Sequence, residues 1–124
     1  VRTLSAKTAS YAPLFSESNQ VFTTTGAGAS VDFNLPAIAS LGVTYTFVNT
    51  GAFNLNVNPS GNSATGNHIR LIRNVSGATV TVPASGDKIR AISRGANIVL
   101  VAASTDNWIV QSQDGDVWSD INDN

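Results

Sequence analysis

The stretch VTYTFVNTGAFNLNVN, residues 43–58, contains two runs in which apolar and polar residues alternate. Alternation with a period of two places the apolar side chains of each run on one face of an extended strand. These side chains are Val43, Tyr45 and Phe47 in the first run and Phe53, Leu55 and Val57 in the second. The break at residues 50–52 (Thr-Gly-Ala) therefore predicts a β-hairpin with one dry face and one wet face.

The rest of the chain repeats short extended runs at a spacing of about ten residues. Residues 30–35 alternate in the same way, and the sequence Asn-Pro-Ser-Gly-Asn at residues 58–62 is a strong turn signal. Residues 97–103 are apolar almost throughout, which predicts a strand buried on both faces. No stretch has a helical period. The sequence thus predicts an all-β chain, a single-domain antiparallel β-sandwich or a jelly-roll-like barrel.

The alternation also predicts which side chains build the core and which face outward. The expected core residues are Val43, Tyr45, Phe47, Leu55, Val57, Leu100 and Trp108. The polar positions of the two runs are expected to face solvent or a sister subunit. They are Thr44, Thr46, Asn54 and Asn56.

Three segments follow from the pattern. Residues 1–18 have no sustained period, and Pro13 interrupts any helix or central strand. Both an extended N-terminal arm laid on another surface and an edge strand of the same domain fit this segment. Residues 19–118 form the β-domain, and residues 119–124 form an acidic C-terminal tail, either solvated or in contact with a basic partner.

The composition favours a subunit of an assembly. Charged residues make up only 12 % of the 124 residues, and Ser, Thr and Asn take their place. Such a surface is easily desolvated against a partner, because few full charges must lose their water. The net charge of −1 provides no basic excess for nucleic acid, and no run is long enough to span a bilayer. The absence of Cys excludes disulfides and thiolate metal sites.

The sequence offers little support for catalysis. Ser63, His68 and Asp87 have the residue types of a hydrolase triad, yet no nucleophile-elbow motif surrounds the serine. His68 is the only histidine, and with scattered carboxylates it does not readily supply a zinc site. We therefore expect no enzyme activity and no cofactor.

Aspartates crowd the C-terminal region, at Asp114, Asp116, Asp120 and Asp123. Calcium requires many oxygen ligands that converge from a constrained loop. The sequence DGDVWSDIND lacks the spacing of an EF-hand, and Trp118 in its middle indicates packing. This pattern favours a solvated tail over a calcium site.

Several short phrases occur in a characteristic order. They are FTTTGA (residues 22–27), VDFNLPA (31–37), GVTYTFVN (42–49), LNVNP (55–59), GD (86–87), NWIV (107–110) and GDVW (115–118). This series resembles a β-rich module of tailed-bacteriophage structural proteins, found in head decoration (cement) proteins and in tail- or head-fibre segments. The resemblance covers the chain from about Tyr11 to Trp118. It implies a trimeric virion component without catalytic residues.

Two functions follow from the resemblance. The first is a capsid decoration subunit, made in the host cytoplasm, that binds the major capsid protein on the outer surface of the shell as a homotrimer and stabilises it. The second is a receptor- or glycan-binding module of a tail or head fibre, which would bind a host-surface glycan through loops such as residues 58–67. A length of 124 residues suits a complete small cement subunit and favours the first. We expect the capsid or subunit interface at Leu4, Tyr11, Leu14, Phe15 and Trp118.

Overall fold

The computed structural model describes residues 3–36, 38, 40–59, 68–73, 79–82, 88–104, 107–114 and 118–121. Strands dominate these residues, and the one helical element is a 3₁₀ turn at Phe15–Glu17. The strands are β1 (Leu4–Ala6), β2 (Val21–Thr23), β3 (Val31–Asn34), β4 (Thr44–Val48), β5 (Leu55–Asn58), β6 (His68–Arg73), β7 (Thr79–Val82), β8 (Lys88–Ala91), β9 (Asn97–Ser104), β10 (Asn107–Asp114) and β11 (Ser119–Ile121). The predicted all-β class is confirmed.

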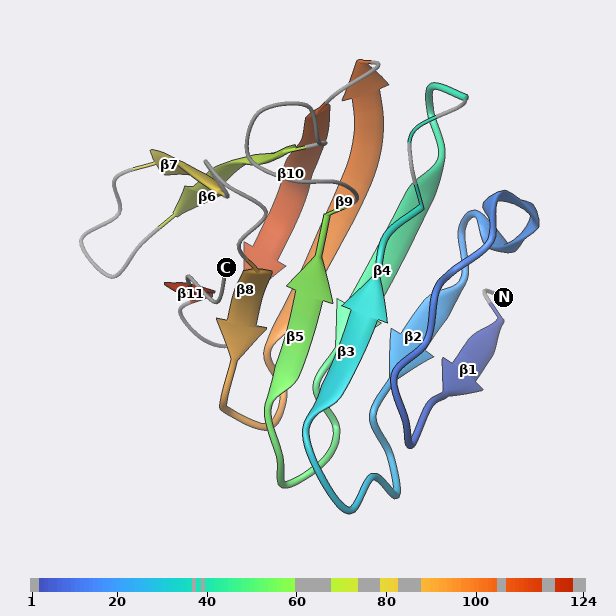
Figure 1. The fold of residues 1–124 in the computed structure, drawn as a ribbon, viewed down its shortest axis with the longest axis vertical. Coiled ribbons are helices and arrows are strands. Elements are labelled where there is room, and N and C mark those ends of the chain that lie inside the picture. The colour runs from blue at the N-terminus through green and yellow to red at the C-terminus, as the bar shows by residue number, and fades with distance from the viewer. Residues whose placement is uncertain are drawn as a thin grey trace.

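The strands form two sheets that lie face to face as a β-sandwich (Figure 1). One sheet has seven strands in the order β1-β2-β4-β9-β10-β6-β7, and the other has four in the order β11-β8-β5-β3. In each sheet one face packs on the opposite sheet, and no described strand or helix covers the other face. This arrangement explains why apolar and polar residues alternate along the strands.

Both sheets are mixed, so the predicted antiparallel pairing holds for only part of them. β2 runs parallel to β1 and β4, β3 runs parallel to β5, and β6 runs parallel to β10. The chain crosses to the other sheet after β2, after β3 and after β4. After two such crossings the chain re-enters its sheet in the same direction, which makes β4 parallel to β2 and β5 parallel to β3.

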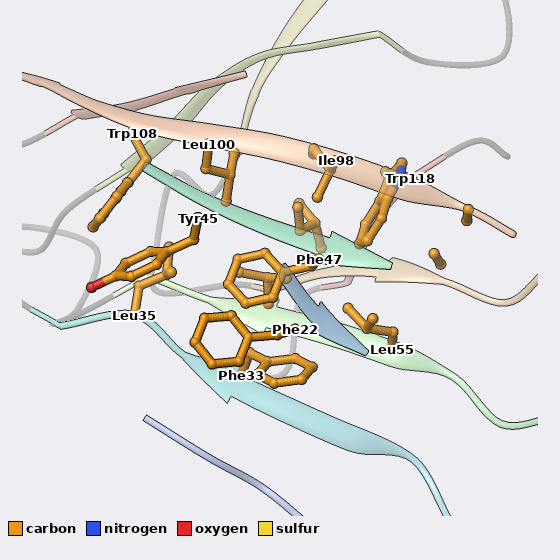
Figure 2. Packing of buried hydrophobic residues seen from close by; sticks show 14 of the residues in the cluster. Phe22, Phe33, Leu35, Tyr45, Phe47, Leu55, Ile98, Leu100, Trp108 and Trp118 are labelled. Atoms are coloured by element: carbon orange, nitrogen blue, oxygen red, sulfur yellow. The ribbon is translucent and has the colours of Figure 1, made fainter. Parts of the chain in front are cut away.

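The hairpin predicted at residues 43–58 is wrong. β4 pairs with β2 and β9 in the seven-stranded sheet, whereas β5 pairs with β3 and β8 in the four-stranded sheet. Residues 49–54 therefore cross between the sheets. Alternation specifies which face of a strand is buried but not which strand lies beside it. Tyr45 and Leu55 still point into the same core, from opposite layers (Figure 2).

All seven expected core residues are buried between the sheets. Aromatic rings fill much of this space (Figure 2), and the Phe22 centroid lies 5.7 Å from those of Phe33 and Phe47. Tyr45 lies 5.6 Å from Trp108 at one end of the cluster. Such pairs add about 0.5–1.5 kcal/mol each beyond the burial of apolar area. The aromatic content of the core thus fixes the distance between the layers.

Three expectations about individual side chains and one about a strand are corrected. Phe53, expected in the dry face, is partly exposed because it lies in the crossover before β5. Thr46 and Asn56, expected at the surface, are buried. β9 does not have two buried faces: its burial alternates, because only one side of the sheet meets the other layer.

One end of the sandwich is fastened by the buried side chain of Asn49, which follows β4. Its amide nitrogen donates to the carbonyl oxygens of Phe53, in the crossover before β5, at 3.1 Å and of Ala91, in β8 of the four-stranded sheet, at 3.3 Å. Its backbone N–H donates to the Ala96 carbonyl at 2.8 Å, just before β9. The Thr24 hydroxyl donates to Asn49 Oδ1 at 3.0 Å. One asparagine therefore satisfies backbone groups of both layers where the chain crosses between them.

Candidate contact surface

The N-terminal segment closes one long side of the sandwich (Figure 1). β1 pairs with β2 at the edge of the seven-stranded sheet. Farther along, the Tyr11 N–H donates to the Asp32 carbonyl and the Tyr11 carbonyl accepts from the Asn34 N–H, both at 2.9 Å. These bonds place Tyr11 against β3, at the edge of the four-stranded sheet. Of the two alternatives for residues 1–18, the edge strand describes Leu4–Ala6, and an extended arm is not shown.

A single carboxylate oxygen organises the turn that follows. Glu17 Oε1 accepts the Tyr11 hydroxyl at 2.6 Å and the Leu14 N–H at 2.8 Å. The Leu14 carbonyl accepts the Glu17 N–H at 2.9 Å and the Tyr45 hydroxyl at 2.8 Å. Bonds to a charged acceptor are roughly twice as strong as bonds between neutral groups. The backbone of Leu14 is therefore held at both its donor and its acceptor.

The two phenols in this network have raised pKa values. For Tyr11 the main cause is the hydrogen bond to Glu17, followed by partial burial and the negative charge of that carboxylate. For Tyr45 burial raises the pKa to about 12, with smaller contributions from Glu17 and Tyr11. Both hydroxyls consequently remain protonated donors well above neutral pH.

Lys7 adds a second contact to Tyr11. Its ammonium nitrogen lies 3.7 Å from the centroid of the Tyr11 ring. A cation over an aromatic face contributes about 0.5–1 kcal/mol at exposed sites. The Tyr11 ring also lies 5.7 Å from Phe22 in the core. Tyr11 therefore joins the N-terminal segment to the interior through its ring, its hydroxyl and its backbone.

The leucines of this segment point outward although the backbone is fixed. Leu4 is 70 % exposed and Leu14 is 57 % exposed. Leu41, in the turn before β4, is 62 % exposed. It lies at the same end of the sandwich as Leu14, because the Thr44 N–H donates to the Ser18 hydroxyl at 3.0 Å. Full burial of one leucine contributes about 1.5–3 kcal/mol, so these side chains can stabilise a complex.

The expected interface residues separate into three environments. Leu4 and Leu14 are exposed, whereas Tyr11 and Phe15 are partly buried and pack against the core. Trp118 is only 2 % exposed, so the expectation that it contacts another subunit is corrected. In the chain Trp118 follows β10 of one sheet and precedes β11 of the other. Its indole fills space between the two layers (Figure 2).

The sequence did not single out Leu41 or Ile92, which is 66 % exposed after β8. The signal for Leu41 was its place directly before Gly42, whose φ of +85° marks a turn. A leucine in a turn has no strand face through which to reach the core.

The outer face of the four-stranded sheet carries a row of linked polar side chains. Arg90 Nε donates to Asn56 Oδ1 at 2.9 Å, and Asn56 Nδ2 donates to Asp32 Oδ1 at 2.6 Å. The three residues are register partners on β8, β5 and β3. This row explains the burial of Asn56, whose polar atoms are satisfied by its neighbours on both sides.

The predicted acidic tail begins with a strand. Ser119–Ile121 forms β11 and pairs antiparallel with β8, placing Asp120 opposite Ile89. Its remaining residues, 122–124, lie outside the described residues, as does Asp116. Trp118 anchors the strand that follows it in the core, which explains why this part of the tail joins the sheet.

The other candidate sites of the sequence lie partly outside the described residues. Ser63 and Asp87 of the possible triad lie outside the described residues, as do residues 60–67 of the possible glycan-binding loop. Among the side chains that are described, no three of His, Cys, Asp and Glu gather in a way that could hold a metal ion. Within the same part of the chain, no helix is long and apolar enough to cross a bilayer.

Comparison with known proteins adds no assignment. No protein-family model matches this sequence, and no curated protein matches it. The function proposed for the chain therefore rests on the N-terminal contact surface and on the ordered sequence phrases.

Proposed function

We propose that the chain is a non-enzymatic virion protein of a tailed bacteriophage, a capsid decoration (cement) subunit. It binds the major capsid protein on the outer surface of the shell as a homotrimer and stabilises the shell. The observation that carries this proposal is the state of Leu14: its backbone is held by Glu17 and Tyr45, and its side chain is exposed. The ordered phrases shared with the phage module support the same function.

A fixed backbone makes an exposed leucine an efficient contact. Ordering a mobile segment on binding costs conformational entropy, and a segment that is already ordered avoids that cost. Leu14 and Leu41 are both exposed at one end of the sandwich, so this end offers two apolar side chains to a shell. Three copies in a trimer repeat each contact, so modest single interfaces add up to strong attachment.

Binding alone is sufficient to stabilise the shell, and no catalysed reaction is needed. A ligand that binds only the expanded shell shifts the equilibrium toward that state by mass action. The chain needs no catalytic group for this role, only a stable scaffold and a complementary surface. Its β-sandwich supplies the scaffold, and the N-terminal segment, held by the hydrogen bonds of Tyr11, Leu14 and Glu17, supplies the surface.

The experiment is a co-sedimentation assay with purified expanded capsids that carry no decoration protein. Wild-type protein is expected to bind stoichiometrically, and Leu14→Ser to bind at least about tenfold more weakly, which corresponds to about 1.4 kcal/mol. Ile92→Ser is the matched control, because Ile92 is also a large apolar side chain and is exposed to a similar extent. It lies at the opposite end of the sandwich, since Ala91 pairs with Leu55 where β5 begins.

Two results would overturn the proposal. One is an absence of binding to expanded capsids together with adsorption of the protein to host cells, which would favour the receptor- or glycan-binding fibre module. The other is equal loss of capsid binding in Leu14→Ser and Ile92→Ser.

A further inference from the structure

At β1, the edge of the seven-stranded sheet, the backbone N–H and C=O groups of Leu4 and Ala6 point away from the sheet. The Val21 N–H donates to the Thr3 carbonyl at 2.8 Å, and the Lys7 N–H donates to the Thr23 carbonyl at 2.9 Å. Because successive residues of a strand direct their backbone groups to alternate sides, those of Leu4 and Ala6 point away from β2. In the described chain, β1 is the last strand at this side of the sheet (Figure 1).

β1 is a short edge strand of three residues, and it carries no charge, proline or bulge of its own. Natural edges carry charges, prolines or bulges that prevent pairing with another chain. β1 reads Leu-Ser-Ala, and Leu4 and Ala6 are both exposed. The nearby charge of Lys7 is turned onto the ring of Tyr11. By contrast, the edge of the other sheet at β3 is covered by Tyr11.

We propose that β1 pairs with β1 of a second copy of this chain, antiparallel and across a two-fold axis. In that register Leu4 lies opposite Ala6 of the partner subunit, and the two exchange both backbone hydrogen bonds. The same pair forms on the other side of the axis, which gives about four hydrogen bonds in total. A large side chain meets a small one at both positions, so the edge is complementary to itself.

This contact assigns the predicted interface residues to different partners. Leu4 belongs to a contact between subunits, and Leu14 belongs to the contact with the shell. The inference rests on the proposed function only where it assigns Leu14 to the contact with the shell. A two-fold contact is separate from the three-fold contact of a trimer, so in trimers it joins subunits of adjacent trimers. Its short strand makes it weak alone, and many copies on one shell make it effective.

The first experiment measures mass in solution by light scattering and native mass spectrometry over a range of concentrations. Wild-type protein is expected to form even-numbered species, a dimer or a pair of trimers. Leu4→Lys and Ala6→Pro are expected to halve that mass, because the first adds a charge to the edge and the second removes an outward N–H. Leu41→Lys is the matched control and is expected to keep the wild-type mass. Circular dichroism checks that each variant folds.

The second experiment uses the natural absence of cysteine. In the proposed register Ser5 lies opposite Ser5 of the partner subunit in a non-hydrogen-bonded pair, with Cα atoms about 4.5 Å apart, close enough for a disulfide. Mild oxidation is expected to cross-link Ser5→Cys at concentrations where Ser40→Cys, a control at an exposed turn, stays uncross-linked.

The proposal is overturned if wild-type mass shows only monomers or trimers at all concentrations, or if Ser5→Cys cross-links no faster than Ser40→Cys. It is also overturned if Leu4→Lys and Ala6→Pro keep the wild-type mass. Capsid binding of the same variants is measured separately. If the protein does not bind capsids, the masses measured in solution still show whether β1 pairs with β1. If β1 does not pair, capsid binding still depends on Leu14.

Discussion

The Tyr11 hydroxyl donates a 2.6 Å hydrogen bond to Glu17 Oε1, the same oxygen that accepts the Leu14 N–H. Tyr11 is also bonded through its backbone to the strand that ends one sheet. Through these two residues a segment without regular periodicity becomes part of the sandwich. The result is an apolar side chain, Leu14, that is exposed on an ordered backbone.

Removal of the Glu17 carboxylate should loosen this segment without unfolding the domain. In Glu17→Ala the Tyr11 hydroxyl and the Leu14 N–H lose a charged acceptor, which costs about 1.5–3 kcal/mol when the donors find no other partner. Exposure to water reduces that cost, so we expect a small loss in the free energy of unfolding. Amide hydrogen exchange at Leu14 should accelerate strongly, while exchange at Phe47 in β4 stays slow. Unchanged exchange at Leu14 would show that the carboxylate does not hold the segment.

Asn49 should contribute far more to stability than its size suggests. Asn49→Ala removes the amide donor to the carbonyls of Phe53 and Ala91 and the acceptor of the Thr24 hydroxyl proton. Each unsatisfied buried group costs about 1–3 kcal/mol, so the free energy of unfolding should fall by at least about 2 kcal/mol. Urea denaturation measures it. Asn97→Ala, which removes a single exposed bond to the Gly95 carbonyl, should change it by less than about 0.5 kcal/mol.

A methyl group at Gly51 should be poorly tolerated. A Cβ there would lie 2.9 Å from the Thr24 carbonyl oxygen, a backbone atom that cannot move without disturbing the crossover. Overpacking of this kind typically costs about 1–3 kcal/mol. Gly28→Ala is the control, because a Cβ at Gly28 meets no atom within 4 Å. Thermal unfolding should show a lower Tm for Gly51→Ala and no loss for Gly28→Ala. Equal values would contradict the close approach of residues 24 and 51.

Stability should decline at alkaline pH because of Tyr45. Its pKa is raised from 10.0 in the unfolded chain to about 12 in the folded protein. The unfolded chain therefore loses its proton first, and the contribution of Tyr45, complete below pH 10, is lost as pH rises toward 12. Tyr11, whose pKa is also raised, contributes in the same direction. The free energy of unfolding, measured by urea between pH 9 and pH 12, should fall less steeply in Tyr45→Phe than in wild type.

The sequence predicted the sandwich because alternation reports burial directly. It placed Tyr45, Phe47, Leu55 and Val57 in the core, and all four are buried. It did not predict the partners of β4, since the same alternation fits a hairpin or a crossing between sheets. The distinction depends on the buried Asn49, whose hydrogen-bond partners are distant in sequence.

The contact surface was predictable only in part. The aperiodic segment predicts exposure of Leu4 and Leu14, and both are exposed. The place of Trp118 near an end of the sequence predicts a contact with another subunit, yet its indole lies between the layers. Position in the sequence carries no information on burial when the last strand returns to the sheet, as β11 does.

The most direct test of the proposed function is a cryo-EM reconstruction of expanded capsids incubated with saturating wild-type protein. The account predicts density for the sandwich on the outer surface of the shell, with the end that carries Leu14 and Leu41 toward the major capsid protein. The end that carries Ile92 should face solvent. Shells without added density, or density with the Ile92 end against the shell, would contradict it.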